Sequence, residues 1–131
     1  MPPKPLERER RPECKPQRVP HRGGNKLHNK CADRIPQNSY SGWDALVNRK
    51  NFDALQERTR TLWEVKTNAI ETYNPYILRA ELEKQVEEAR REHDIAAACG
   101  YDFVVGVRTE AHKKLLEQED FTLKVVVMDW C

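Results

Sequence analysis

The feature that most constrains the fold is a long amphipathic segment at residues 75–99. Pro75 suits the first turn of a helix, Asn74 before it can cap the helix, and Gly100 can end it. One stripe of mainly apolar residues recurs at three- and four-residue spacing: Ile77, Leu78, Leu82, Gln85, Val86, Ala89, His93, Ala96 and Ala97. Most other positions are charged, so we expect a helix with one packed face and one solvated face.

Short segments that favour strands lie on both sides of this helix. Residues 43–55 hold two apolar stretches, WDALV and FDAL, around the polar break NRKN, which indicates a hairpin. TLWEVKT (61–67) follows a second polar turn and predicts a third strand. The other expected elements are a short helix at 25–35 capped by Asn25, a strand at 101–109, a helix at 110–118 and a final strand at 121–130. This order predicts an α/β fold with a mixed central sheet flanked by helices.

The first 24 residues differ in composition from the rest. Six of the eight prolines lie in the first twenty residues, and two glycines follow them. We therefore expect a proline-rich basic linker or arm at 1–24 and a folded domain at 25–131. Residues 1–30 hold nine Lys/Arg and three Glu, a net charge of +6, whereas the remainder carries −4. Such an arm suits a polyanion, although basic tails also serve as solvated linkers.

The four cysteines, Cys14, Cys31, Cys99 and Cys131, are far apart and form no CxxC pair. This spacing argues against a zinc ribbon or a thioredoxin-type motif, and free thiols in a reducing compartment are expected rather than a disulfide. No apolar run approaches the roughly 18–20 residues needed to cross a bilayer. The start, MPPKPLERERR, lacks the apolar region of a signal peptide, so export would require a carrier.

Glu64 and Lys66 are two residues apart in the expected strand, so their side chains project from the same face, while Trp63 and Val65 point the other way. Pairing of this strand with the preceding one about their turn brings Asp53 next to Glu64. Two carboxylates can hold Mg²⁺, which retains waters for the substrate phosphate and the nucleophile. A lysine can orient that water or bind the scissile phosphate. The alternative is a solvated strand face in a chain with 34% charged residues.

FDAL followed by LWEVKT resembles the PD-(D/E)xK, or restriction endonuclease-like, nucleases. Their signature is an acid near the end of one strand and E-x-K in the next, followed by a long helix and another strand. Asp53, Glu64 and Lys66 match it, and residues 43–109 match the αβββαβ core order; Phe52 departs from the name-giving proline. The resemblance implies a restriction endonuclease-like core in which Asp53 and Glu64 bind Mg²⁺ (or Mn²⁺) and all three residues are catalytic.

A narrower resemblance covers more of the chain. HNKCAD, NxxxGWDALVNRKNFDAL and LWEVKT are similar to nuclease domains at the C-termini of bacterial polymorphic toxins. This resemblance implies an antibacterial effector that is exported within a larger delivery protein and hydrolyses nucleic acid, DNA in preference to RNA, in the cytoplasm of a target bacterium. A cognate immunity protein is the expected partner, and no interaction with a membrane is expected. The alternatives are a housekeeping repair or recombination nuclease and an inert nuclease-like module that only binds.

Four further polar residues are candidates for supporting roles: His28, Asp33, Asp44 and Gln85. His28 and Asp33 could supply a phosphate contact or a further acid, or act only as surface and capping residues of the short helix. Asp44 could neighbour the metal site or be an edge-strand charge. Gln85 could be directed at the site from the long helix, as in related nucleases, or be half-buried without a role. His112 has no partner that the sequence identifies, and we assign it none.

Overall fold

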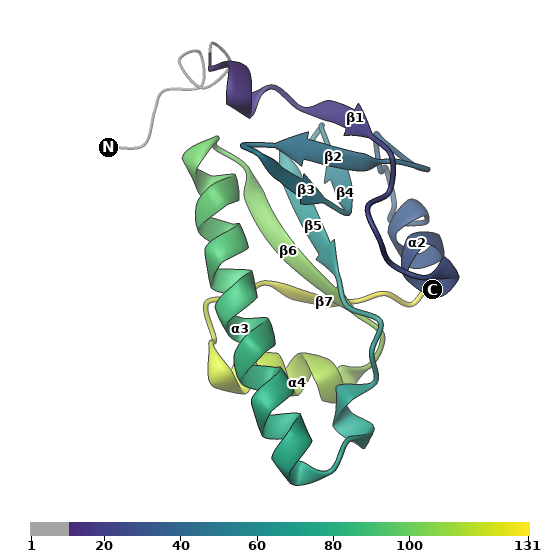
Figure 1. The fold of residues 1–131 in the computed structure, drawn as a ribbon, viewed down its shortest axis with the longest axis vertical. Coiled ribbons are helices and arrows are strands. Elements are labelled where there is room, and N and C mark those ends of the chain that lie inside the picture. The colour runs from purple at the N-terminus through teal and green to yellow at the C-terminus, as the bar shows by residue number, and fades with distance from the viewer. Residues whose placement is uncertain (1–10) are drawn as a thin grey trace.

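The computed structural model describes residues 11–131, which form two sheets and three α-helices (Figure 1). The sheets have the strand orders β1-β2-β3 and β4-β5-β6-β7. The strands are β1 (Gln17–Val19), β2 (Asp44–Val47), β3 (Lys50–Phe52), β4 (Ala54–Gln56), β5 (Thr61–Val65), β6 (Asp102–Val107) and β7 (Val125–Val127). The helices are α2 (Lys26–Asp33), α3 (Pro75–Ala98) and α4 (Glu110–Glu119), with 3-10 turns η1 (Pro12–Cys14) and η2 (Ile70–Thr72). The expected α/β fold with a mixed sheet is confirmed.

Strand β5 lies inside the second sheet, antiparallel to β4 and parallel to β6. Ala54 pairs with Trp63 and Gln56 with Thr61, which is the register expected from the turn between the strands. The backbone N–H of Asp53 extends this pairing by donating to the carbonyl of Trp63 at 2.9 Å. The expected juxtaposition of Asp53 with β5 is therefore confirmed.

Helix α3 covers one face of this sheet (Figure 1). It begins as expected, because the Ile77 N–H donates to the Asn74 side chain at 3.0 Å, and it ends before Gly100, whose φ is +77°. Its apolar stripe packs in one cluster with residues of β5 and β6, among them Leu62 and Phe103. The opposite face of the sheet packs against α2 in a smaller cluster.

Residues 11–24 belong to the folded domain, whereas an arm was expected there. Strand β1 pairs antiparallel with β2, from Gln17 opposite Leu46 to Val19 opposite Asp44. Three residues of β1 can add to an existing sheet edge although proline surrounds them, because proline is tolerated outside the ladder positions that must donate. The first ten residues of the expected arm lie outside the described part of the chain.

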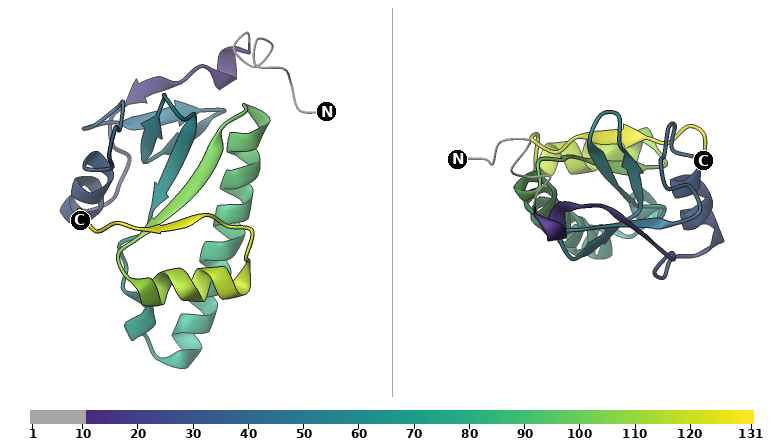
Figure 2. Two further views of the ribbon diagram at one scale, coloured as in Figure 1. Left: turned by 180° about the vertical axis from the view of Figure 1, so that it is seen from behind. Right: turned by 90° about the horizontal axis from the view of Figure 1, so that it is seen from above.

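All four cysteines form disulfides, so the prediction of free thiols is wrong. Cys14 is bonded to Cys99 and Cys31 to Cys131, across sequence separations of 85 and 100 residues. Figure 2 shows the C-terminus beside α2, where the second bond lies. Pairs this distant leave no spacing motif, so only the tertiary structure reveals them.

Several expected strands have different bounds, and FDAL is divided between β3 and β4. The polar break NRKN contains only a two-residue turn, because Asn48 and Arg49 have positive φ angles of 50° and 68°, so Lys50 and Asn51 already belong to β3. The final strand shortens to Val125–Val127, because the Asp120 carboxylate accepts from the Thr122 N–H and holds a turn before it. Within residues 11–131, no helix has the length and apolar character needed to cross a membrane.

Candidate active site

Asp53 lies between β3 and β4 and is buried, with 8% of its surface exposed. Its Oδ2 accepts a hydrogen bond of 2.7 Å from the Val65 N–H of the neighbouring strand. The same oxygen lies 3.3 Å from Nε2 of His28, which extends from α2. Asp53 is thus held in place from two sides, by the end of β5 and by a helix.

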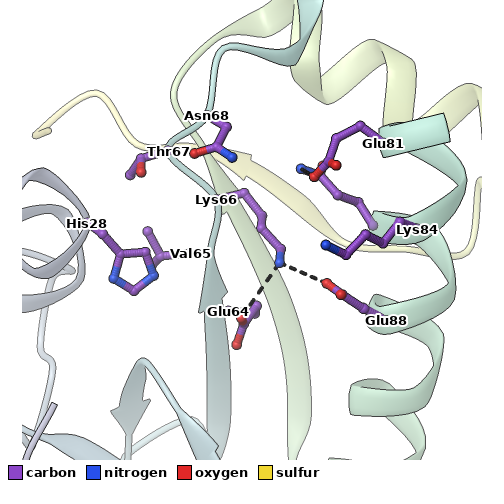
Figure 3. Close-up of a pocket in the computed structure, with 10 residues that line it drawn as sticks. His28, Glu64, Val65, Lys66, Thr67, Asn68, Glu81, Lys84 and Glu88 are labelled. Carbon is purple, nitrogen blue, oxygen red and sulfur yellow. Dashed lines mark hydrogen bonds and ion pairs between the residues drawn. The ribbon is translucent and has the colours of Figure 1, made fainter. Parts of the chain in front are cut away.

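Glu64 lies in β5 and Lys66 directly follows it, and both side chains share the face toward α3, as alternation along an extended chain predicts. Lys66 Nζ lies 3.9 Å from Glu64 Oε1 and 3.0 Å from Glu88 Oε2 of α3 (Figure 3). Sequence reasoning did not identify Glu88. Its place at helical spacing from Gln85 is a weak signal, because solvated charges occupy most of that helix.

The charge on Glu64 is poorly compensated. Burial, reinforced by the nearby charges of Asp53 and Glu92, raises the pKa of Glu64 well above its ordinary value, although Lys66 acts against this. Glu64 Oε2 is buried and has no hydrogen-bond partner among the described residues. An unpartnered carboxylate oxygen in such a place costs stability, which makes Glu64 a candidate functional group.

The cationic groups of the site retain their charge. Burial opposes the charge of Lys66, but Glu64 and Glu88 outweigh it and raise the pKa of the ammonium. The contact with Asp53 outweighs burial and raises the pKa of His28 to about 9. At neutral pH both side chains are therefore cations that face carboxylates.

Two polar cavities meet at His28 and Glu64. The first, which we call the helix cavity, measures about 250 Å³ and lies between β5 and α3 (Figure 3). The second, the loop cavity, measures about 310 Å³ and lies beside residues 20–24 and the β2–β3 turn. The helix cavity is also lined by Val65, Lys66, Thr67, Asn68, Glu81, Lys84, Gln85 and Glu88. The loop cavity is also lined by Arg22, Gly24, Asp44, Arg49, Lys50, Asn51 and Asp53.

Asp33 and Asp44 contact His21, a residue the sequence analysis did not single out. His21 Nδ1 donates to Asp44 at 2.7 Å and Nε2 donates to Asp33 at 2.9 Å. Burial opposes the charge on His21, but the two carboxylates outweigh it and raise its pKa. Asp44 still lines the loop cavity, whereas Asp33 lines neither of the two cavities.

Gln85 is buried and lines the helix cavity. This position agrees with the expectation that Gln85 is directed at the site from the long helix. Its Oε1 accepts a 2.7 Å hydrogen bond from Nε2 of His112, which is 1% exposed. Burial lowers the pKa of His112, so the ring is neutral when it donates this bond. His112 therefore has a partner that its sequence position did not reveal, and Gln85 links α4 to the site.

The expected divalent cation requires oxygen ligands from this site. Within residues 11–131, no group of three or more His, Cys, Asp or Glu side chains is arranged to hold a metal ion. Mg²⁺ needs fewer protein ligands, because it commonly uses one or two carboxylates and completes its shell with water and substrate phosphate. Asp53 and Glu64 supply two carboxylates, and the unpartnered Oε2 of Glu64 is a free oxygen ligand. The residues present fit such an ion.

The chain belongs to a family of unknown function, DUF6310, whose model matches residues 6–131. None of the curated proteins and none of the solved structures matches it significantly.

Proposed function

For this member of the DUF6310 family, we propose the function of a metal-dependent nuclease that hydrolyses phosphodiester bonds, with DNA as the favoured substrate. Asp53 and Glu64 would hold Mg²⁺ or Mn²⁺, and Lys66 would act on the phosphate. The observation that carries the proposal is the buried, unpartnered carboxylate oxygen of Glu64 at the junction of two polar cavities. The coarse order of a helix, successive strands, the long helix α3 and strand β6 also supports it, because the nuclease resemblance implies this order, although β2 and β3 lie in a different sheet from β4, β5 and β6.

The chain's own residues would divide the chemistry among them. When bound, the ion would lower the pKa of a coordinated water and neutralise charge that builds on the phosphorus centre. Lys66, held at 3.0 Å by Glu88, would direct its ammonium toward a phosphate oxygen. His28 would hold Asp53 in position through Nε2 and place a positive charge beside the reacting phosphate. The Val65 N–H would fix the Asp53 carboxylate through its 2.7 Å hydrogen bond.

We further propose that this nuclease acts as an antibacterial effector, delivered by a larger protein and neutralised by an immunity partner. The two disulfides support passage through an oxidising compartment, because such bonds form and persist there. Expression of the chain in the cytoplasm of a bacterial strain that permits disulfide formation should be lethal, and the Glu64→Gln variant should be tolerated. A wild-type chain that is harmless although folded would overturn the effector proposal.

The test of the nuclease proposal is cleavage of plasmid DNA and of a structured RNA by the purified chain. Cleavage should require Mg²⁺, stop when EDTA is added, and be lost in Glu64→Gln and Lys66→Met. Glu87→Gln is the matched control, since Glu87 is an exposed glutamate of α3 that lines neither of the two cavities. Absence of cleavage of both substrates by the folded wild type would overturn the proposal and favour a binding module.

The contact between His28 and Asp53 favours a second candidate, a metal-independent ribonuclease. Glu64 would take the proton of a ribose 2′-hydroxyl as its oxygen bonds to phosphorus. His28 would turn its Nε2 proton from Asp53 to the 5′-oxygen and give it up as the bond from phosphorus to that oxygen breaks. The raised pKa values of both groups suit this exchange near neutral pH. Cleavage of RNA that persists in EDTA, without cleavage of DNA, would select this candidate over the first.

A further inference from the structure

The loop cavity has one wall that the proposed chemistry does not use. Residues 20–24, which we call loop 20–24, form this wall with Arg22 and Gly24. Arg49 of the β2–β3 turn and Lys50 at the start of β3 form another wall. The cavity opens onto Asp53 and other site residues, so a ligand in it would lie next to the reaction centre.

Loop 20–24 is held firmly in this position. The ring of His21 bridges Asp44 and Asp33 at 2.7 and 2.9 Å, and the Arg22 N–H donates to Asp44 Oδ2 at 3.0 Å. Gly24, with φ at +75°, packs directly on His28, because a Cβ at this position would lie 2.8 Å from the ring Nδ1. The loop is thus built against the site by contacts at both of its ends.

Two of the cations on these walls have no acidic partner. Among the described residues, no carboxylate lies within ion-pair distance of Arg22 or Arg49, and both side chains are exposed. Asp44 lines the same cavity, but both of its oxygens accept bonds from loop 20–24. Lys50 differs, since its Nζ lies 3.5 Å from Glu92.

We propose that the loop cavity is a binding subsite for the backbone phosphate next to the scissile one, with Arg22 and Arg49 as its cationic groups. Guanidinium groups match phosphate oxygens in charge and in planar geometry. The substrate strand would cross from this subsite over His28 and Glu64 into the helix cavity, where the exposed Lys84 lies. The inference rests on the proposed function and assigns its substrate class, a nucleic-acid strand longer than one nucleotide.

The test measures binding without cleavage. Every variant carries Glu64→Gln and is held in EDTA, and fluorescence anisotropy follows short labelled single-stranded DNA, single-stranded RNA and duplex DNA. The double change Arg22→Ala and Arg49→Ala should weaken binding of the preferred strand about tenfold or more. It should also reduce the magnitude of the log–log salt slope by about 0.7 for a single strand, because one phosphate contact is lost.

Arg58→Ala is the matched control, because Arg58 is an exposed arginine of the β4–β5 turn that lines neither of the two cavities. Arg58→Ala should change the affinity for the labelled strands by less than twofold. Thermal melting of each variant shows that the fold is retained. A double variant that melts like its parent but binds every strand with unchanged affinity and unchanged salt slope would overturn the subsite.

The outcomes for the subsite and for the nuclease proposal are separable. Metal-dependent cleavage by the wild type with unchanged binding in the double variant would remove the subsite and leave the nuclease. Absence of cleavage together with binding that depends on Arg22 and Arg49 would remove the nuclease and leave a nucleic-acid-binding site. The three labelled strands show which kind of backbone the subsite accepts.

Discussion

The two faces of strand β5 are built in opposite ways. On the face toward α2, Trp63 and Val65 are buried in an apolar cluster with Met128, and the Cys31–Cys131 disulfide closes this side. On the face toward α3, Glu64 and Lys66 end the strand among other charges, and one carboxylate oxygen of Glu64 lacks a partner. One face contributes stability by burying apolar surface, and the other gives up stability to keep charged groups available. This contrast within four consecutive residues separates the scaffold from the candidate site.

The largest expected effect is on the polar face. Glu64→Gln should reduce cleavage by about a hundredfold or more, as removal of a group that stabilises developing charge does. The same change should leave the free energy of unfolding unchanged or increase it, because it removes a buried charge with poor compensation. Cleavage kinetics and urea unfolding measure the two effects. A variant that loses stability together with activity would contradict the division between the faces.

The next effect concerns the disulfide of the apolar face. Replacement of Cys31 and Cys131 by alanine opens a loop with a sequence separation of 100 residues. The free energy of unfolding should therefore fall by about 4 kcal/mol, while the folded fraction keeps most of its specific activity. The double alanine variant of Cys14 and Cys99 is the matched comparison, since its separation is 85 residues and its loss should be similar. Denaturant unfolding without reductant gives both values.

A smaller effect is expected from a cavity on the apolar face. Met128 is 2% exposed, so Met128→Ala should lower the free energy of unfolding by about 3 kcal/mol. Because the side chain lies on the α2 side of the sheet, activity per folded molecule should change little. If this variant lost activity as steeply as Glu64→Gln, the two faces would have to be treated as one functional unit.

The smallest effect is a pH dependence. Asp53 raises the pKa of His28 from 6.5 to about 9, so its contribution to stability is fully present below pH 6.5 and is lost as the pH rises through about 9. Solvent screening of this partly exposed ring limits the loss to about 1 kcal/mol. In urea unfolding, the free energy of unfolding should decline as the pH rises across this range. The variant His28→Gln should show a smaller decline. His21→Gln serves as the comparison, because the pKa of His21 is also raised, but by Asp44 and Asp33 and not by Asp53.

Much of the candidate site could be predicted from local patterns. Alternation along β5 placed Glu64 with Lys66, and the symmetry of the β4–β5 turn placed Asp53 beside them. The predicted start of α3 also held, because capping by Asn74 is a local interaction. His28 was a candidate without a partner, and the structure supplies that partner in Asp53.

The missed features all depend on distant segments. Glu88 and His112 acquire their roles only when α3 packs against β5 and α4, and His21 acquires its role when loop 20–24 meets α2 and β2. The composition of the N-terminal segment predicted an arm for residues 11–24 as well. Proline content describes local flexibility, and it does not report that a three-residue strand can pair with a distant sheet edge.

The sequence alone determined the fold class, the long helix and the face shared by Glu64 and Lys66, because helical and strand periodicities are properties of consecutive residues. The tertiary structure decided the cysteine pairing, the unpartnered oxygen of Glu64 and the walls of the two cavities. These features depend on burial and on charges brought together across the sheet. Desolvation and close charges set the chemistry of a carboxylate, and neither exists until the chain has folded.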